Sequence, residues 1–599
     1  MVGIQLELSW FEVRRRQVNI LPNSQVLRAV EPIELEAKET GKASMVKLDK
    51  KDAAIIASIS TLFFIVAVYN VGLTRIPSTT WGVKQGTLTL QLEGPTKVDS
   101  MYLFVNSDVD ITSAISVPNG DTWTAKAYVS THAYYQWLYL DLNETTTDRI
   151  RMRFYFDAGD IIEIAVVDAD QKQANIVSIS SDDLATAPID NLIDEQKLFE
   201  NPPTFRSETM FDEELFVRAS QQYLNHQEPT AEETHPPLGK LIIAAGIAVF
   251  GFTPFGWRIF GVVFAALMIP IIYYLGFALF KTKAAATIAS SLLALDFMPF
   301  AMGRIGTVDT FLLFFILLST LFFYLNYEKM VSGSKPDFKL IVLGLIAFSL
   351  AFSVKWIAIF GFLGEAAVFL LAGVFGSSPI IGKTARLKTL IRPILIITCL
   401  VPIIGAIIYF GTFIPYASLG HSLSDIWKAQ WGMLGYHTEM GYYNHPNASN
   451  WYEWPMDLSP LWFVTKSFPW GMLSTISAMG NPLIWWVGLV AILSSIADGI
   501  KLKWPHLFLG VLYIAQLIPY ALISRYLFIY HYYAEVPILA LATAGLVHEM
   551  WYKPKQRRYV VILVAAAAIF FAVFYPVISG QPIPQWYSGY LHWFRDWRF

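Results

Sequence analysis

The sequence has a single cysteine among its 599 residues, and it has few charged residues. One cysteine, Cys399, excludes a disulfide framework and a cysteine-based metal site. Charged residues make up 15% of the chain, against about 25% in soluble domains. The 44 basic residues are balanced by 47 acidic ones, and this lack of a basic excess argues against a nucleic-acid-binding protein. No glycine-rich phosphate loop follows a predicted strand, so the sequence gives no sign of a soluble nucleotide substrate.

Apolar residues are abundant, at 54% of the chain with a mean hydropathy of +0.44. This composition indicates a polytopic α-helical membrane protein. The first apolar run, 53–71, follows three lysines and has no signal-peptide cleavage pattern. We therefore predict a cytoplasmic N-terminal tail (1–52) and a first transmembrane helix (53–75) that remains attached.

Residues 76–210 have the composition of a soluble domain. Alternation places Met152, Phe154 and Phe156 on one face of a predicted strand, and Pro118-Asn119-Gly120 is typical of a turn. The segment predicts a β-sandwich-like domain with a small core of its own, inserted in the first outer loop.

Ten further apolar runs follow within a membrane core, 255–578, and five of the loops between them are basic. The positive-inside rule places those loops in the cytoplasm, so about eleven helices cross the membrane and the tail 579–599 faces outward. The short apolar run 238–252 is typical of an interfacial helix, so we assign 211–254 to outer-loop helices. The predicted runs are 255–280, 284–303, 308–326, 339–355, 357–376, 393–414, 481–500, 505–522, 533–550 and 559–578.

Chemically unusual residues gather in the predicted outer loops, one of which is long (415–480). Ionisable groups at membrane depth are costly and need a reason to be there. Each also has an ordinary explanation: an acidic pair complements a helix N-terminus, a proline pair starts a helix, and tryptophans line a membrane interface. Their collection on one face favours a site that handles an anion from the bilayer. These residues are Asp212, Glu213, His235, Asp309, Lys355, His437, His445, Trp454, Arg525, Tyr530 and His531.

In this order the residues resemble the protein O-mannosyltransferase family, and the resemblance runs from about residue 211 to the C-terminus. Five collinear blocks carry it: Asp212-Glu213 with His235-Pro236-Pro237-Leu238-Gly239-Lys240, the block from His445 to Pro455, Gly480-Asn481-Pro482, the block from Arg525 to Tyr532, and Ser579-Gly580-Gln581-Pro582. The resemblance implies a GT-C membrane fold and transfer of a mannose-type sugar from a polyprenyl or dolichyl phosphate to Ser/Thr hydroxyls of proteins. Expected partners are that lipid, a protein acceptor and membrane lipids. The expected location is the cell membrane, with an extracytoplasmic site.

The resemblance implies Asp212 as the catalytic base, and the chemistry of the other residues suggests their roles. Glu213 and Asp309 are candidates to orient the acceptor or hold a divalent metal, although no spacing demands a metal. Arg525 is the first choice for the leaving phosphate because its planar fork suits that group. The remaining candidates for binding donor or substrate are Lys355, Arg258, His531, His235, His437, His445, Trp454 and Tyr530.

Two alternatives remain open. The acceptor is a lipid or glycan in one, as in the aminoarabinose transferases. In the other the chain is a transporter, but we find neither an internal repeat nor polar residues in mid-span.

Overall fold

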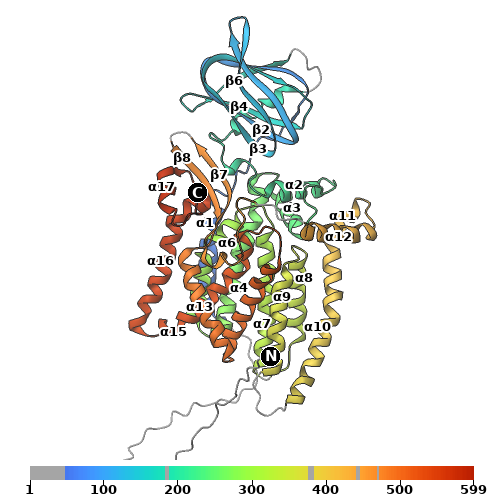
Figure 1. Ribbon diagram of the computed structural model, residues 1–599, viewed down its shortest axis with the longest axis vertical. Coiled ribbons are helices and arrows are strands. Elements are labelled where there is room, and N and C mark those ends of the chain that lie inside the picture. The colour runs from blue at the N-terminus through green and yellow to red at the C-terminus, as the bar shows by residue number, and fades with distance from the viewer. Residues whose placement is uncertain (1–47, 182–187, 333, 376–382, 440–444, 469–470) are drawn as a thin grey trace, which may run out of the picture. The chain divides into compact units, whose positions relative to one another are not determined.

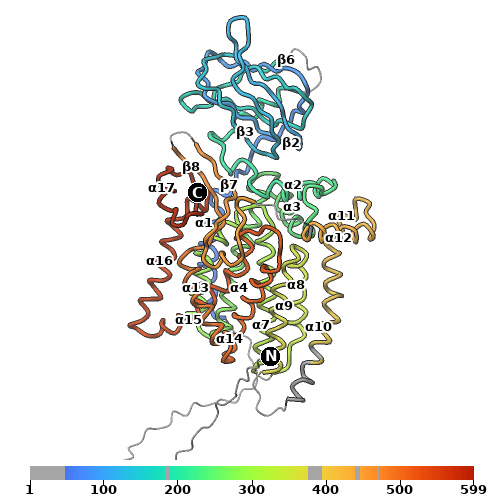
Figure 2. The backbone as a smooth tube through the Cα atoms, in the orientation of Figure 1, coloured from blue at the N-terminus to red at the C-terminus, as the bar shows by residue number. Residues whose placement is uncertain are grey.

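The computed structural model describes residues 48–599 except 182–187, 333, 376–382, 440–444 and 469–470 (Figure 1; Figure 2). Most of the predicted tail 1–52 lies outside the described residues. The chain that follows combines a helical membrane core with two β-sheets.

Within the described residues, eight helices are long and apolar enough to cross a membrane. A ninth crossing is formed if α5 (Lys283–Ala294) and α6 (Phe297–Gly303), which are bent by 54°, make one broken span. The other two predicted crossings are α8 (Phe338–Phe352) and α15 (Val536–Trp551), with 15 and 16 residues. The total of eleven therefore stays a prediction. The eight helices are α1 (Lys50–Val68), α4 (Pro254–Phe280), α7 (Asp309–Val331), α9 (Ala358–Phe375), Ile394–Gly411 of α10 (Lys383–Gly411), α13 (Pro482–Ile500), Trp504–Leu522 with α14 (Trp504–Leu517), and α16 (Pro554–Ser579).

Local sequence explains where the helices begin. Asp49 accepts hydrogen bonds from the amides of Lys51 and Asp52 at the start of α1, which is N-capping. Proline stands in the first turn of α4, α13, α14, α15 and α16, where its missing N–H costs nothing.

The predicted β-rich segment contains a six-stranded antiparallel sheet between Trp81 and Ser181, in the order β1-β4-β2-β3, with β5 paired to β4 and β6 paired to β2. The domain bounds 76 and 210 stay a prediction. Arg151 pairs with Thr89 on one side and Ser116 on the other, so the long β2–β3 hairpin curls back on itself. Met152 and Phe154 are buried as predicted, but Phe156 follows the end of β3 and is 66% exposed. The prediction that Phe156 shares one strand face with Met152 and Phe154 is therefore wrong. The strands are β1 (Trp81–Gly82), β2 (Gly86–Asn119), β3 (Thr122–Phe154), β4 (Asp160–Asp168), β5 (Gln173–Ala174) and β6 (Ile176–Ser181).

The β-domain has two apolar faces. One face encloses the domain's own core, which includes Leu88, Ile150 and Ile164. On the other face, Phe104 and Trp137 belong to a hydrophobic cluster that also contains residues of α2, α3, α4 and α7. The β-domain therefore packs against the helical segment that begins with Asp212 and Glu213.

That segment contains α2 (Glu213–Leu224) and α3 (Leu238–Phe250). At 13 residues, α3 is about 20 Å long, too short for a hydrocarbon core of about 30 Å. Its assignment as an interfacial helix stays a prediction.

The described part of the long loop 415–480 contains α12 (Leu423–Glu439), the short 3-10 helix Trp454–Met456, and the paired strands β7 (Leu461–Phe468) and β8 (Met472–Ala478). The short helix α11 (Ile414–Ser418) leads into it. The C-terminal tail returns to this loop, because β9 (Ile583–Pro584) pairs with β8 before α17 (Gln585–Leu591). This second sheet, β7-β8-β9, has no counterpart in the sequence-based expectations.

Candidate active site

Arg258 of α4 is fully buried beneath the Asp-Glu pair. Its Nε and Nη2 donate to Glu213 at 2.7 and 2.6 Å. Its remaining N–H groups donate to the carbonyl oxygens of Val71, Phe205 and Glu208. All five guanidinium donors are therefore used. The role predicted for Arg258 as a helper of the donor phosphate is replaced by a structural one.

Glu213 is likewise enclosed, with no exposed surface. Besides Arg258, its carboxylate accepts from the amides of Gly306 at 2.7 Å and Met210 at 3.0 Å. It thereby joins the loop before α2 to the loop before α7. Each oxygen of Glu213 thus accepts two hydrogen bonds from the protein, which leaves none for an acceptor hydroxyl or a metal.

Asp212 lies one residue earlier and has the opposite environment. Its carboxylate is half-buried and makes no hydrogen bond or ion pair within the described residues. Burial raises the pKa of Asp212 to about 6, although the charge of Lys355 opposes this shift. The preceding residue, Phe211, has a left-handed backbone (φ 49°), a costly conformation for a bulky residue. Asp212 is thus a free carboxylate with the basicity that general base catalysis needs.

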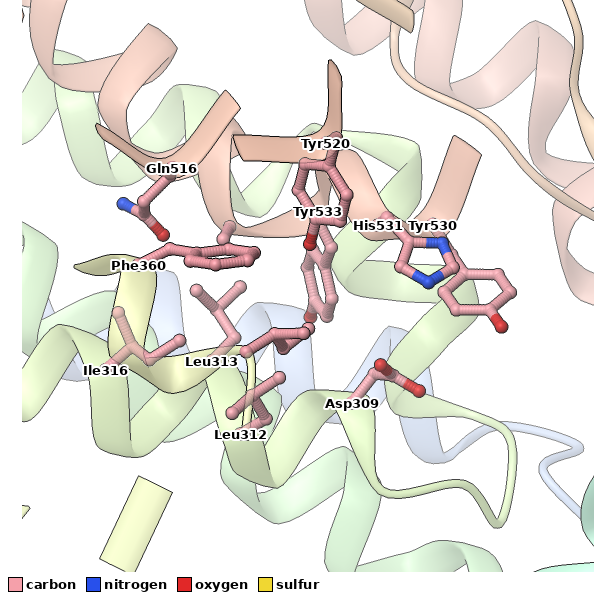
Figure 3. Close-up of a pocket in the computed structure, with 12 residues that line it drawn as sticks. Asp309, Leu312, Leu313, Ile316, Phe360, Gln516, Tyr520, Tyr530, His531 and Tyr533 are labelled. Atoms are coloured by element: carbon pink, nitrogen blue, oxygen red, sulfur yellow. The ribbon is translucent and has the colours of Figure 1, made fainter. Parts of the chain in front are cut away.

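Asp309 and Lys355 form a buried ion pair next to this carboxylate. The Lys355 Nζ donates to Asp309 Oδ1 at 2.8 Å and lies 5.6 Å from the ring centre of Tyr530. Figure 3 shows Asp309, Tyr530 and His531 around the same cavity. The structure therefore brings together five predicted residues from four separate segments: Asp212, Asp309, Lys355, Tyr530 and His531.

Arg525 is the predicted phosphate ligand. It is half-buried and makes no ion pair or hydrogen bond within the described residues. Its charge acts on neighbouring groups: burial, then His235, then Arg525 lower the pKa of His437 to about 4. Because Arg525 is unpaired in this part of the chain, its planar fork remains available to an anion.

In the His-Pro-Pro-Leu-Gly-Lys block, at the start of α3, two side chains contact the same carboxylate. His235 Nδ1 lies 2.8 Å from Glu232 Oε1, and Lys240 Nζ donates to Glu232 Oε2 at 2.6 Å. His437 of α12 donates from Nε2 to the carbonyl oxygen of Thr234 at 3.0 Å. Burial lowers the pKa of His235. Burial therefore disfavours the charged form of both histidines, although Glu232 opposes this shift at His235.

Aromatic rings enclose the other side of the cavity. The ring of His531 stacks on Tyr530 with centroids 4.6 Å apart, and Trp454 stacks behind it at 6.0 Å. Trp454 is fully buried and donates to Ser449 Oγ, so it packs the site rather than lining a membrane interface. His445 is exposed and packs on Tyr526, at the rim of this group.

Sequence reasoning missed two structural residues. Glu232, which holds His235 and Lys240, has no distinguishing pattern because it lies in an ordinary acidic loop. Asp296 accepts hydrogen bonds from the Asn481 amide and from Trp485 Nε1, which explains the Gly480-Asn481-Pro482 block as a structural joint. The apolar context of Asp296 was the available signal.

Among the described residues, no three or more His, Cys, Asp or Glu side chains are grouped as they would be to hold a metal ion. The carboxylates proposed for a metal, Glu213 and Asp309, already have protein partners. We therefore derive no step through a metal.

Two family models match the chain. One, described as Dolichyl-phosphate-mannose-protein mannosyltransferase, matches residues 234–404. The other, described as the C-terminal four TMM region of protein-O-mannosyltransferase, matches residues 422–597. Together they account for most of the chain from α3 onward.

Curated relatives and a solved structure agree with these matches. The polyprenol-phosphate-mannose–protein mannosyltransferase of Mycobacterium tuberculosis is 23% identical over 451 residues, 65% of this chain and 86% of that protein. The protein of the same name from Corynebacterium glutamicum is 24% identical over 429 residues, 61% of this chain and 81% of its own length. The S. cerevisiae protein O-mannosyltransferase Pmt1-Pmt2 complex bound to the sugar donor has a TM-score of 0.56 at 12% identity, covering 65% of this chain and 89% of that chain. The predicted polytopic GT-C membrane fold is confirmed, and the chain belongs to the protein O-mannosyltransferase family.

Proposed function

We propose that this protein transfers mannose from a polyprenyl-phosphate donor to Ser or Thr hydroxyls of proteins, at the extracytoplasmic face of the membrane. The observation that supports it most directly is the unpaired carboxylate of Asp212, whose raised pKa places its proton affinity near neutrality. The names of the similar mycobacterial and corynebacterial proteins agree with this donor and acceptor.

Asp212 is the general base in this reaction. Its carboxylate takes the proton of the acceptor hydroxyl while the hydroxyl oxygen forms a bond to the anomeric carbon of mannose. The bond from that carbon to the phosphate oxygen breaks through an oxocarbenium-like state, and polyprenyl phosphate leaves with the electron pair. Attack opposite the phosphate inverts the anomeric carbon, so a β-linked donor gives an α-linked product.

The leaving phosphate is stabilised by the cationic side chains near Asp212. Arg525 has no competing partner in the described chain and supplies two parallel N–H donors. Lys355 is held by Asp309 at 2.8 Å, which fixes its position and partly neutralises it.

The test is transfer of labelled mannose from polyprenyl-phosphate mannose by the purified protein in proteoliposomes. One peptide contains Ser and Thr, and a matched peptide has Ala at those positions. We expect α-linked mannose on the first peptide only. Transfer to lipid or glycan instead of peptide would favour the alternative acceptor class, and retention of the anomeric configuration would contradict a single displacement.

A further inference from the structure

One face of α12 is an exposed apolar stripe formed by Leu423, Trp427, Trp431 and Leu434, which we call the α12 stripe. These side chains are 81%, 57%, 60% and 40% exposed. Their spacing of four, four and three residues places them on one side of the helix. Contiguous exposed apolar surface of this kind marks an interaction site.

The other two faces of α12 have different surroundings. Ile426 and Met433 are buried against the protein, and on that side Gln430 accepts a hydrogen bond from Tyr409 of α10. A third face is polar and exposed, with Asp425 and Lys428 in an ion pair at 3.0 Å. A helix with one face toward protein, one toward water and one apolar is typical of a helix lying in the plane of a membrane interface.

The α12 stripe continues the apolar surface of a span. α10 exposes Ile403, Ile407 and Phe410 on one side, and Ile414 of α11 follows at 68% exposure. Figure 1 shows α11 and α12 lying across the end of α10. Tryptophan at the end of a span prefers the headgroup region, where its ring is apolar and its N–H remains hydrated.

We propose that the α12 stripe docks into the lipid headgroup region of the bilayer, on the side of the candidate active site, and thereby holds the site at the depth of a membrane-held phosphate. The face of α12 that packs on the protein connects the helix to the site, because His437 donates a hydrogen bond to the Thr234 carbonyl, next to His235. The kinetic consequence rests on the proposed function, whereas the position of the stripe does not.

The first experiment measures position alone. Single labels are introduced by Trp427→Cys, Trp431→Cys and the smaller change Leu434→Cys, in a Cys399→Ser background because Cys399 is exposed. Lys428→Cys, at a side chain that is 73% exposed, is the matched control on the same helix. Nitroxide spectra in proteoliposomes should show greater access to oxygen than to a water-soluble nickel chelate at the stripe, and the reverse at residue 428.

Two results would overturn this placement. Equal access to the nickel chelate at the stripe and at residue 428 would mean that the stripe faces water. Spin–spin broadening in singly labelled protein would mean that a second copy covers it. The Leu434 label keeps both outcomes measurable if a tryptophan exchange prevents folding.

The second experiment measures the consequence for transfer. The double exchange Trp427→Ser and Trp431→Ser should raise KM for a long-chain polyprenyl-phosphate mannose in proteoliposomes about tenfold, or about 1.4 kcal/mol. KM for a short-chain, water-soluble mannosyl phosphate should not change. Trp586→Ser on α17, at a side chain 65% exposed, is the control. An unchanged KM for the long-chain donor would refute the coupling, whereas a wild-type protein without any transfer would refute the proposed function and leave the spectra to decide the placement.

Discussion

Asp212 and Glu213 are neighbours in the chain but have opposite surroundings. Glu213 is enclosed and bonded to Arg258, Gly306 and Met210, whereas Asp212 has no such partner in the described residues. One helix start therefore supplies both a fixed anchor and a free base.

Asp212→Asn should lower kcat by about 10²–10⁴-fold, the usual contribution of a general base. Because the pKa of Asp212 is raised to about 6, its carboxylate becomes protonated below that pH. In the wild type, kcat/KM should fall as pH decreases through 6, and in the variant this acidic limb should disappear. Glu214→Gln is the neighbouring control. Near wild-type turnover of Asp212→Asn would assign the base to another residue, with Asp309 as the first candidate.

Arg525→Lys should reduce kcat/KM for the donor by about tenfold to a hundredfold. Lysine keeps the charge but loses the planar fork, and a charge-assisted hydrogen bond contributes about 1.5–3 kcal/mol. Donor titrations in proteoliposomes measure the effect, and Lys466→Arg is a control at a lysine that is paired with Glu208. Unchanged kinetics with the donor would remove Arg525 from the phosphate site.

Glu213→Gln should lower the free energy of unfolding by about 3–5 kcal/mol, because removing one member of a buried ion pair leaves Arg258 uncompensated. Thermal unfolding of the purified protein measures this, with Glu214→Gln as the reference. A variant with wild-type stability and lost transfer would instead return Glu213 to the acceptor-orienting role first predicted from the sequence.

At the level of elements, the starts of α3 and α7 meet at a position that tolerates no side chain. A Cβ on Gly239 would lie 2.4 Å from Val308 Cγ1, one residue before Asp309. The amide of Leu238 also donates to the Ser353 carbonyl at 3.2 Å, two residues before Lys355. The family block therefore aligns α3 with both members of the Asp309–Lys355 pair.

Gly239→Ala should separate these helix starts and lower kcat by at least about tenfold, in line with the sensitivity of catalysis to displacements of 1 Å. The control is Gly411→Ala at the end of α10, where a Cβ meets no atom within 4 Å. Transfer assays on both variants decide the point. Equal activity would show that α3 does not position the pair.

Sequence patterns predicted the elements better than the pairings. Apolar runs located the spans and alternation located the buried Met152, because both signals depend on local periodicity. Charged residues at membrane depth identified Asp309 and Lys355 as candidates but did not reveal that they bond each other. The same reasoning did not predict the surroundings of Arg258, because its hydrogen-bond partners lie 45 residues or more away in the chain. The sequence around an arginine does not show whether such distant partners bury it.

At the scale of the whole molecule, the side of the membrane on which each loop lies depends on whether α8 crosses the bilayer. Its 15 residues extend about 22 Å, less than a hydrocarbon core of about 30 Å. Lys355, three residues after its C-terminal end, nevertheless lies close enough to Asp212 for its charge to act on that carboxylate. We expect α8 to cross with help from the turn that follows it.

Membrane-impermeant maleimide should therefore label Lys335→Cys and Ser424→Cys from opposite sides, in a Cys399→Ser background. The candidate spans α9 and α10 lie between these positions, so they are on opposite sides only if α8 also crosses. Intact and opened vesicles are compared, with Gln581→Cys, at an exposed side chain, expected on the side of residue 424. Labelling of residues 335 and 424 from the same side would exclude α8 as a crossing.

Arg304, two residues before Gly306, is fully buried and joins the two ends of the membrane core. It donates to the carbonyl oxygens of Ala67 in the last turn of α1, of Tyr69 and Asn70 just after it, and of Ser579 at the end of α16. During synthesis, residues 67–70 leave the ribosome long before residue 579. The loop that leads to Asp309 therefore gains its hydrogen bond to residue 579 only when translation is nearly finished, so a chain that ends before residue 579 lacks this contact.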